Sequence, residues 1–252
     1  MNDKRRLRRE LSDIASDTLD FLKTGFRSET GEKASERGSS TGADRGVDSA
    51  PPEAGPREPE AGRAKSELFD AVVKQVLTCT KCPLHRGRRN AVPGKGSIDA
   101  AVVFIGEGPG ETEDIRGEPF VGRAGQLLTK MLAGIDLKRE EVYITNIVKC
   151  RPPNNRAPLP EESDACFPYL ERQLALIDPK VICCLGGPAA QVVLRTSQGI
   201  TKLRGAFHRY KDTPVIPTYH PAAVLRFPDK YRRDVWNDLK MLRDYLRDLK
   251  KS

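Results

Sequence analysis

The sequence has no run of 18 consecutive apolar residues, and no apolar stretch follows its basic first residues. The first absence argues against a transmembrane helix, and the second argues against a secretory signal peptide. We therefore expect a protein of the reducing cytoplasm that has no membrane partner. In that compartment we expect the six cysteines to be metal ligands or catalytic groups before disulfides.

Residues 31–65 contain no aromatic side chain and only one large aliphatic residue, Val47. A segment of this composition buries too little apolar surface to offset the entropy lost on ordering. We therefore expect a disordered linker between an N-terminal segment, 1–30, and a folded domain, 66–252. Residues 4–25 place apolar side chains on one helical face. They predict an amphipathic helix that docks on a protein partner or folds back on the domain.

The formal net charge of +8 falls entirely within residues 66–252, because residues 1–65 are balanced. A basic folded domain suits a polyanion such as nucleic acid. Charge alone does not separate this interpretation from a basic protein that has no such partner.

Four short segments rich in β-branched residues predict buried strands of a parallel sheet. Helical patterns separate these strands, and this alternation is typical of an α/β fold with helices on both faces of the sheet. The predicted strands are 101–105, 142–148, 180–185 and 214–219, and the predicted helices are 67–77, 123–134, 161–177, 187–196 and 229–249.

Polar residues and glycines stand at the carboxyl end of each predicted strand. Open α/β sheets bind their ligands beyond these ends, so we expect the residues to meet in one site. The glycines after the third strand open a helix whose free N–H groups suit a phosphate. The residues are Gly106 and Glu107 after the first strand, Asn146, Lys149 and Cys150 at the second, Gly186 and Gly187 after the third, and His220 after the fourth.

Four of the six cysteines lie in or beside predicted loops. Cys79 and Cys82 form a CxxC pair, whereas Cys150 and Cys166 follow at wide and irregular spacing. Such a set predicts either a zinc ion or a [4Fe–4S] cluster, and the spacing favours the cluster only slightly. The other two cysteines, at positions 183–184, fall inside a predicted strand, so we expect them to be buried and not to be ligands.

Four motifs follow one another along the folded domain: Gly106–Asp114 (GEGPGETED), Pro119–Leu128 (PFVGRAGQLL), Thr145–Pro153 (TNIVKCRPP) and His220–Leu225 (HPAAVL). Together they resemble the family 4 uracil-DNA glycosylases, the iron–sulfur uracil-DNA glycosylases of bacteria and archaea. The resemblance runs from about residue 77 to residue 246. It implies a three-layer α/β/α sandwich with a four-stranded parallel sheet. It also implies a [4Fe–4S] cluster on Cys79, Cys82, Cys150 and Cys166.

The resemblance also implies an activity in base excision repair. The enzyme would hydrolyse the N-glycosidic bond of uracil in double- or single-stranded DNA, release uracil and leave an abasic site. The target base must leave the stack to be reached. We expect the protein to act as a monomer.

Several pocket residues receive roles from the same resemblance. Asn146 would offer a donor and an acceptor to the uracil edge, a pattern that cytosine reverses. Phe120 would stack on the flipped base. His220 would donate a hydrogen bond to uracil O2, where negative charge develops as the bond breaks. Gly106 and Gly108 would complete the substrate-binding pocket.

Glu107 is the second catalytic candidate, and it would handle the attacking water. Gly108 and Gly110 stand where family 1 enzymes carry an aspartate and a tyrosine, so the usual base is missing. Glu113 would take over the exclusion of the thymine methyl group. The predicted DNA contacts are Leu225 and Arg226 in the minor groove, and Lys149, Arg151, Arg123 and Gly187 at phosphates.

Two other interpretations stay open. A non-catalytic iron–sulfur protein that binds DNA or senses damage would share the composition, although the combination of Asn146, Phe120 and His220 argues against it. A relative in the same superfamily that traps the abasic sugar covalently would carry a glutamine in the first motif and an Arg-rich loop near the histidine. This chain has Gly108 in that motif and lacks such a loop.

Overall fold

The computed structural model describes residues 60–251. The predicted helix at 4–25 and most of the predicted linker lie outside the described residues, so both stay predictions. The end assigned to the linker is wrong, because helix α2 (Glu60–Leu77) already begins at Glu60. An ion pair of 3.1 Å between Arg63 and Glu67, one helical turn apart, is a local contact that favours this earlier start.

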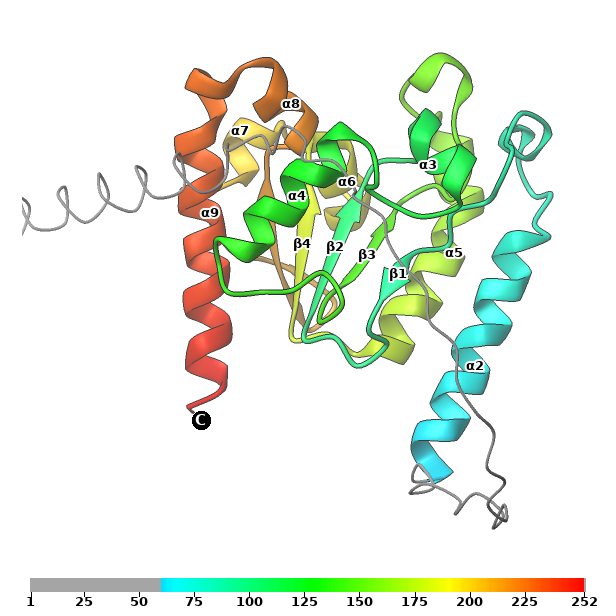
Figure 1. Cartoon of the computed structure of the whole chain (residues 1–252), viewed down its shortest axis with the longest axis horizontal. Coiled ribbons are helices and arrows are strands. Elements are labelled where there is room, and N and C mark those ends of the chain that lie inside the picture. The colour runs from blue at the N-terminus through cyan, green and yellow to red at the C-terminus, as the bar shows by residue number, and fades with distance from the viewer. Residues whose placement is uncertain (1–59, 252) are drawn as a thin grey trace, which may run out of the picture.

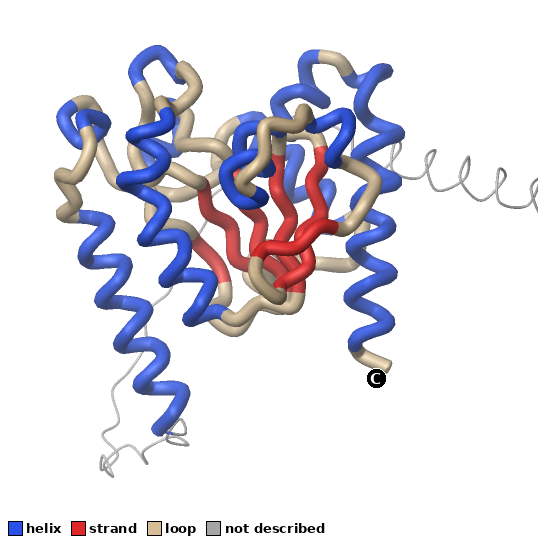
Figure 2. The backbone as a smooth tube through the Cα atoms, turned by 180° about the vertical axis from the view of Figure 1, so that it is seen from behind, coloured by secondary structure: helices blue, strands red, loops and turns tan. Residues whose placement is uncertain are grey.

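A six-stranded sheet runs through the centre of the molecule in the order β1-β3-β2-β4-β6-β5 (Figures 1 and 2). The inner strands β3, β2, β4 and β6 are parallel, and they confirm the four predicted strands with small shifts at the ends. The strands are β1 (Lys95–Gly96), β2 (Val102–Gly106), β3 (Tyr143–Asn146), β4 (Val181–Leu185), β5 (His208–Tyr210) and β6 (Thr213–Thr218).

The two edge strands correct the predicted count of four. Both β1 and β5 pair antiparallel with their neighbours. The two residues of β1 are exposed, and no residue of β5 is fully buried. Neither strand therefore carries the apolar run by which the inner strands are recognised. The α/β class is unaffected, because the parallel strands still form the centre of the sheet.

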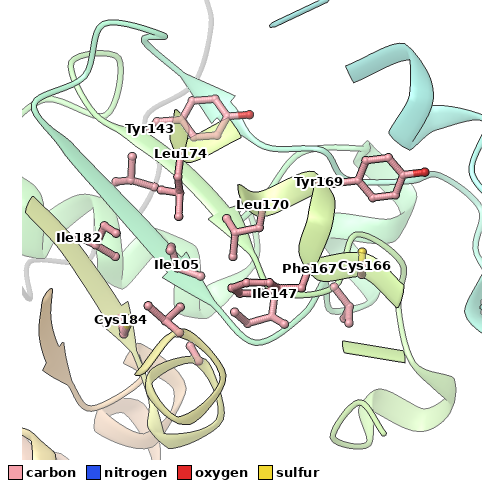
Figure 3. Close-up of a cluster of buried hydrophobic side chains, with 14 of the residues drawn as sticks. Ile105, Tyr143, Ile147, Cys166, Phe167, Tyr169, Leu170, Leu174, Ile182 and Cys184 are labelled. Carbon is pink, nitrogen blue, oxygen red and sulfur yellow. The ribbon is translucent and has the colours of Figure 1, made fainter. Parts of the chain in front are cut away.

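Helices cover both faces of the sheet, as expected for three layers. On one face α2, α5 (Pro160–Ile177) and α6 (Gly187–Leu194) form a core cluster with strand residues such as Ile105. Figure 3 shows part of this cluster, with Leu170 and Leu174 of α5 beside the sheet. On the other face α4 (Arg123–Ala133) and α9 (Pro228–Leu249) form a second cluster.

The two strand cysteines confirm this layering. Successive residues of a strand point to opposite faces, and Cys183 and Cys184 are buried in the second and the first cluster, respectively. Neither lies with the other four cysteines, so the expectation that they are buried and not ligands fits their position.

The carboxyl ends of the inner strands meet at one edge of the sheet. Gly106 and Asn146 are register partners across β2 and β3, and β6 ends shortly before His220. Three short helices that the sequence did not predict gather at this edge (Figure 1). They are α3 (Glu111–Arg116), α7 (Ile200–Leu203) and α8 (Pro221–Arg226), and two 3-10 turns, η1 (Pro83–Arg86) and η2 (Pro153–Asn155), lie in the loops. Within residues 60–251 no helix combines the length and the apolar character needed to span a bilayer.

Candidate active site

Gly106 faces a slot between the side chains of Asn146 and Phe120. A Cβ atom at position 106 would lie 2.4 Å from Asn146 Oδ1 and 2.6 Å from Phe120 Cζ. Real Cβ atoms essentially never come within 3.0 Å of such groups. The missing side chain of Gly106 therefore lets the amide and the ring edge pack directly against the backbone of β2.

Asn146 presents an unsatisfied polar atom in this slot. The residue is 1 % exposed, and its Oδ1 has no hydrogen-bond partner among the described residues. A buried polar atom without a partner costs about 1–3 kcal/mol, so such atoms are uncommon and call for an explanation. Asn146 also lines a cavity of about 450 Å³ at the sheet edge. Its oxygen is therefore an unpaired acceptor in a residue at the wall of that cavity.

Phe120 is held in an unusual backbone conformation beside the slot. Its φ angle of 52° lies in the left-handed region, which residues other than glycine rarely adopt. The two main-chain N–H groups that follow it donate to Glu113 Oε1 at 2.9 and 2.8 Å. Arg139 donates to the carbonyl of Pro119, directly before it. These contacts fix the turn from both sides and hold the ring in place.

His220 is fixed as a neutral imidazole. Its Nδ1 accepts a hydrogen bond of 3.1 Å from the main-chain N–H of Ala222, at the start of α8. The ring proton therefore sits on Nε2, which is left as the donor. Burial lowers the pKa of His220 to about 4, although the charge of Glu113 acts in the opposite direction. The ring centroid lies 5.5 Å from that of Phe120.

Glu107 follows Gly106 and lines the same cavity. Burial raises the pKa of its carboxyl group above the ordinary value, which makes the carboxylate a better proton acceptor. The main-chain oxygens of Gly106 and Glu107 accept hydrogen bonds from Ile147 and Val148 at 2.9 and 3.1 Å, so the loops after β2 and β3 stay joined beyond the sheet.

The cavity unites the residues predicted for substrate and catalysis. Gly106 is the exception, because it is buried outside the cavity lining and packs against Asn146 and Phe120, which do line the cavity. Position 108 must also be small, because a Cβ there would lie 2.8 Å from Val148 Cγ2. The other predicted residues that line the cavity are Glu107, Gly108, Glu113, Phe120, Asn146 and His220.

An ion pair that the sequence did not predict lies at the cavity wall. Arg156 lines the cavity and donates to both carboxylate oxygens of Glu162, at 2.8 and 2.7 Å. Glu162 also accepts the main-chain N–H of Leu159 at 2.8 Å. The hydrogen bonds from Arg156 lower the pKa of Glu162. The pair ties the loop after β3 to the first turn of α5.

The predicted phosphate contacts lie at the surface with one exception. Arg123 is exposed, and so is the predicted minor-groove residue Arg226, which also lines the cavity. Arg151 is partly buried, and its Nε donates to Asn155 Oδ1 at 2.8 Å. Gly187 begins α6. A second cavity of about 520 Å³ includes the next residue of that helix and shares Glu107 with the first cavity.

Lys149 is the exception, and its prediction as a phosphate contact is wrong. The residue is 1 % exposed, and its Nζ donates to Thr145 Oγ1, Asn146 O and Gln173 Oε1. Its charged end therefore points into the protein and does not reach DNA at the surface.

The predicted wedge residue has a more exposed neighbour. Leu225 is partly buried and packs against the second core cluster. Phe227, which directly follows α8, is 50 % exposed and contacts Tyr231 edge to face. The sequence alone does not mark Phe227 as a DNA-contact candidate, because its exposure depends on α8 ending at Arg226.

The four predicted cysteine ligands line one small cavity between α2, η1 and α5. Three N–H donors point at their sulfur atoms. Arg88 Nη1 lies 3.0 Å from Cys150 Sγ, and the main-chain N–H groups of Lys81 and Lys149 lie 3.5 and 3.3 Å from the sulfurs of Cys79 and Cys166. No three ligating side chains within residues 60–251 are already closed around a metal-sized centre. Four convergent thiols with N–H donors nevertheless have the chemistry of a thiolate-ligated group.

The parallel sheet and the cavity at the carboxyl ends of its strands define an α/β protein with a ligand site at the sheet edge. The family model of the Uracil DNA glycosylase superfamily matches residues 93–240, which contain the whole sheet and the cavity.

Three relatives have the same printed name, type-4 uracil-DNA glycosylase. The one from Archaeoglobus fulgidus is 48 % identical over 70 % of this chain and 92 % of its own. The one from Thermotoga maritima is 46 % identical over 73 % and 97 %, and the one from Sulfurisphaera tokodaii is 46 % identical over 71 % and 84 %. This chain belongs to the type-4 uracil-DNA glycosylase family.

Proposed function

We propose that this protein hydrolyses the N-glycosidic bond of uracil in DNA, releasing free uracil and leaving an abasic site. The observation that carries the proposal is the slot at Gly106. There the unpaired Oδ1 of Asn146 and the ring edge of Phe120 both pack against the glycine, and Asn146, Phe120 and His220 line the same cavity.

In this proposal Asn146 selects the base. Its Oδ1 accepts the N3–H of uracil, and its amide N–H donates to O4. Cytosine presents an acceptor at N3 and a donor at C4, so both ends of a buried Asn146 would lose their partners. Each unpaired group costs about 1–3 kcal/mol. Sites that rely on buried hydrogen bonds reject analogues lacking those bonds far better than apolar pockets do.

His220 stabilises the leaving group. As the bond between C1′ and N1 breaks, its electron pair moves into the uracil ring, and negative charge grows on O2. The Nε2–H of a neutral His220 donates to that oxygen and gains strength as the charge grows. The Ala222 N–H on Nδ1 keeps the proton on Nε2, the nitrogen that would donate to the base.

Glu107 completes hydrolysis. The water oxygen bonds to C1′, and one of its protons passes to the Glu107 carboxylate. A carboxylate whose pKa is raised by burial is a stronger base than an exposed one. Glu113 lines the cavity beside the slot, where its carboxylate also limits the room for a methyl group at C5 of the base.

The second part of the proposal concerns the cofactor. Cys79, Cys82, Cys150 and Cys166 would hold a [4Fe–4S] cluster, which when bound supplies structural cross-linking of the loops and no step of the hydrolysis. Cys150 follows Asn146 closely in the chain, so the cluster and the slot depend on the same loop.

DNA reaches the cavity across a basic surface. Arg123, Arg151 and the α6 start at Gly187 would contact phosphates and position the duplex or single strand, and Arg226 would enter the minor groove with Leu225. Leu225, with its exposed neighbour at position 227, would fill the space left by the flipped base. In this proposal the protein works as a monomer in the cytoplasm, and residues 4–25 would bind a protein partner.

A strand-cleavage assay tests the proposal. A labelled oligonucleotide with one uracil, single- or double-stranded, is incubated with the cluster-loaded protein and then heated in alkali. We expect cleavage at the uracil position and none with His220→Ala at matched times. A stable protein–DNA adduct would favour the covalent-trapping relative, and binding without cleavage would favour the non-catalytic DNA-binding protein. Either outcome would overturn the proposal.

A further inference from the structure

Lys149 is a buried lysine whose role the hydrolysis mechanism leaves unexplained. Its Nζ donates to Thr145 Oγ1 at 2.5 Å, to Gln173 Oε1 at 2.8 Å and to the main-chain oxygen of Asn146 at 2.9 Å. All three acceptors are neutral. Within residues 60–251 none of the ion pairs includes Lys149.

A buried ammonium group without a counter-charge is costly, because neutral acceptors replace only part of its hydration. The candidate counter-charge lies in the cysteine cavity, next to the main chain of Lys149. Lys149 lines the small cavity of the four cysteines, and its main-chain N–H donates to Cys166 Sγ at 3.3 Å. Four thiolates around an iron–sulfur core leave a net negative charge there.

The ammonium also contacts the main chain of the residue that would read the base. The main-chain oxygen that it binds belongs to Asn146, whose side chain reads the base. The acceptors of Lys149 are themselves held, because Thr145 Oγ1 and Gln173 Nε2 both donate to the Pro93 oxygen at 2.9 Å. Gln173 Nε2 also lies 3.2 Å from the hydroxyl of Tyr143. The network therefore has little freedom to shift, and it joins β3 to α5 beneath the slot.

We propose that Lys149 is a positioning residue that carries a buried positive charge beside the proposed cluster and clamps the main chain of Asn146, so that the cluster and the base-reading amide are coupled through one residue. The inference rests on the [4Fe–4S] cluster of the proposed function. It assigns Lys149 a role in the reaction without contact to DNA or to the reacting atoms.

Three variants separate charge from packing. Lys149→Met keeps the side-chain stem and removes the ammonium. Gln173→Leu removes one acceptor from the same buried network and leaves the charge. Lys81→Met removes a lysine that also lines the cysteine cavity but is exposed, so water screens its charge. Iron content and visible absorbance of the unmodified protein first establish whether the proposed cluster is present.

The readouts are the cluster reduction potential and the dissociation constant of free uracil. In Lys149→Met we expect a more negative potential, because removal of a positive charge disfavours the added electron. We also expect uracil to bind about tenfold more weakly, the order of effect of one lost hydrogen bond from a charged donor. Lys81→Met should change neither value appreciably. Gln173→Leu should keep the potential of the unmodified protein.

Two results would overturn the inference. The first is a loaded Lys149→Met protein with unchanged potential and unchanged uracil affinity. The second is equal loss of cluster from Lys149→Met and Gln173→Leu, which would mean that the network acts through packing alone. Should Lys149→Met fold without a cluster while Gln173→Leu retains it, the requirement for the charge itself supports the inference. A protein that lacks iron before any substitution would instead refute the proposed cofactor.

Discussion

Replacing Gly106 with alanine tests the base-binding slot most sharply. The new Cβ would lie 2.4 Å from Asn146 Oδ1 and 2.6 Å from Phe120 Cζ, so one or both groups must move by about 1 Å to reach ordinary contact. Extra methyl groups in a packed site typically cost ~1–3 kcal/mol. For a domain of this size that corresponds to a fall in melting temperature of roughly 2–12 °C.

The loss of activity should exceed the loss of stability. A misplacement of about 1 Å at a reacting centre can reduce the rate ~10²-fold. We therefore expect kcat/KM of Gly106→Ala on a uracil-containing oligonucleotide to fall at least that far, at temperatures where the variant is folded. The matched control is Gly199→Ala, because a Cβ at position 199 meets nothing within 4 Å. A Gly106→Ala protein that melts lower but excises uracil at the original rate would refute the slot.

Three further predictions concern the walls of the slot. The pKa of His220 is about 4, below its ordinary 6.5, so the unfolded chain binds the proton first as pH falls. This group alone should remove on the order of 3 kcal/mol of stability between pH 7 and pH 4. Urea titrations at pH 7 and pH 4 should therefore show that His220→Asn loses less unfolding free energy than the unmodified protein. An equal loss in the two proteins would contradict a neutral, buried His220 ring. Asn146→Ala should lower kcat/KM for uracil about 5- to 150-fold, the equivalent of 1–3 kcal/mol. Single-turnover kinetics measure this change, and an unchanged kcat/KM would show that Asn146 does not read the base. Glu113→Ala removes the acceptor of the two main-chain N–H groups that follow Phe120, whereas Glu113→Gln keeps an acceptor for them. Steady-state assays should therefore show an activity about tenfold lower in the alanine variant than in the glutamine variant. Equal activities would mean that Glu113 does not hold the turn.

The inner sheet and the site could be predicted from the sequence because both depend on local patterns. Apolar β-branched runs mark β2, β3, β4 and β6, and parallel strands bring their carboxyl ends to one edge. Gly106, Asn146 and His220 therefore had to lie close together once the strands were assigned. The edge strands escaped prediction because β1 is very short and β5 is not fully buried.

Long-range polar contacts could not be predicted in the same way. Lysine is rarely buried, so the sequence predicts Lys149 at the DNA surface, whereas in the structure Gln173 and Thr145 accept hydrogen bonds from its buried ammonium group. The pair of Arg156 and Glu162 gave no separate sequence signal, because it depends on how the loop after β3 folds back on α5. Such contacts are fixed by the tertiary structure and not by the periodicity of a segment.

Direct detection of the released base tests the central claim. Three oligonucleotides that differ only in one uracil, cytosine or thymine are incubated with the cluster-loaded protein, and the free bases are quantified by mass spectrometry. The account predicts free uracil from the first oligonucleotide and no free base from the other two. Absence of free uracil, or release of cytosine at a comparable rate, would contradict a pocket in which Asn146 and His220 read and release uracil.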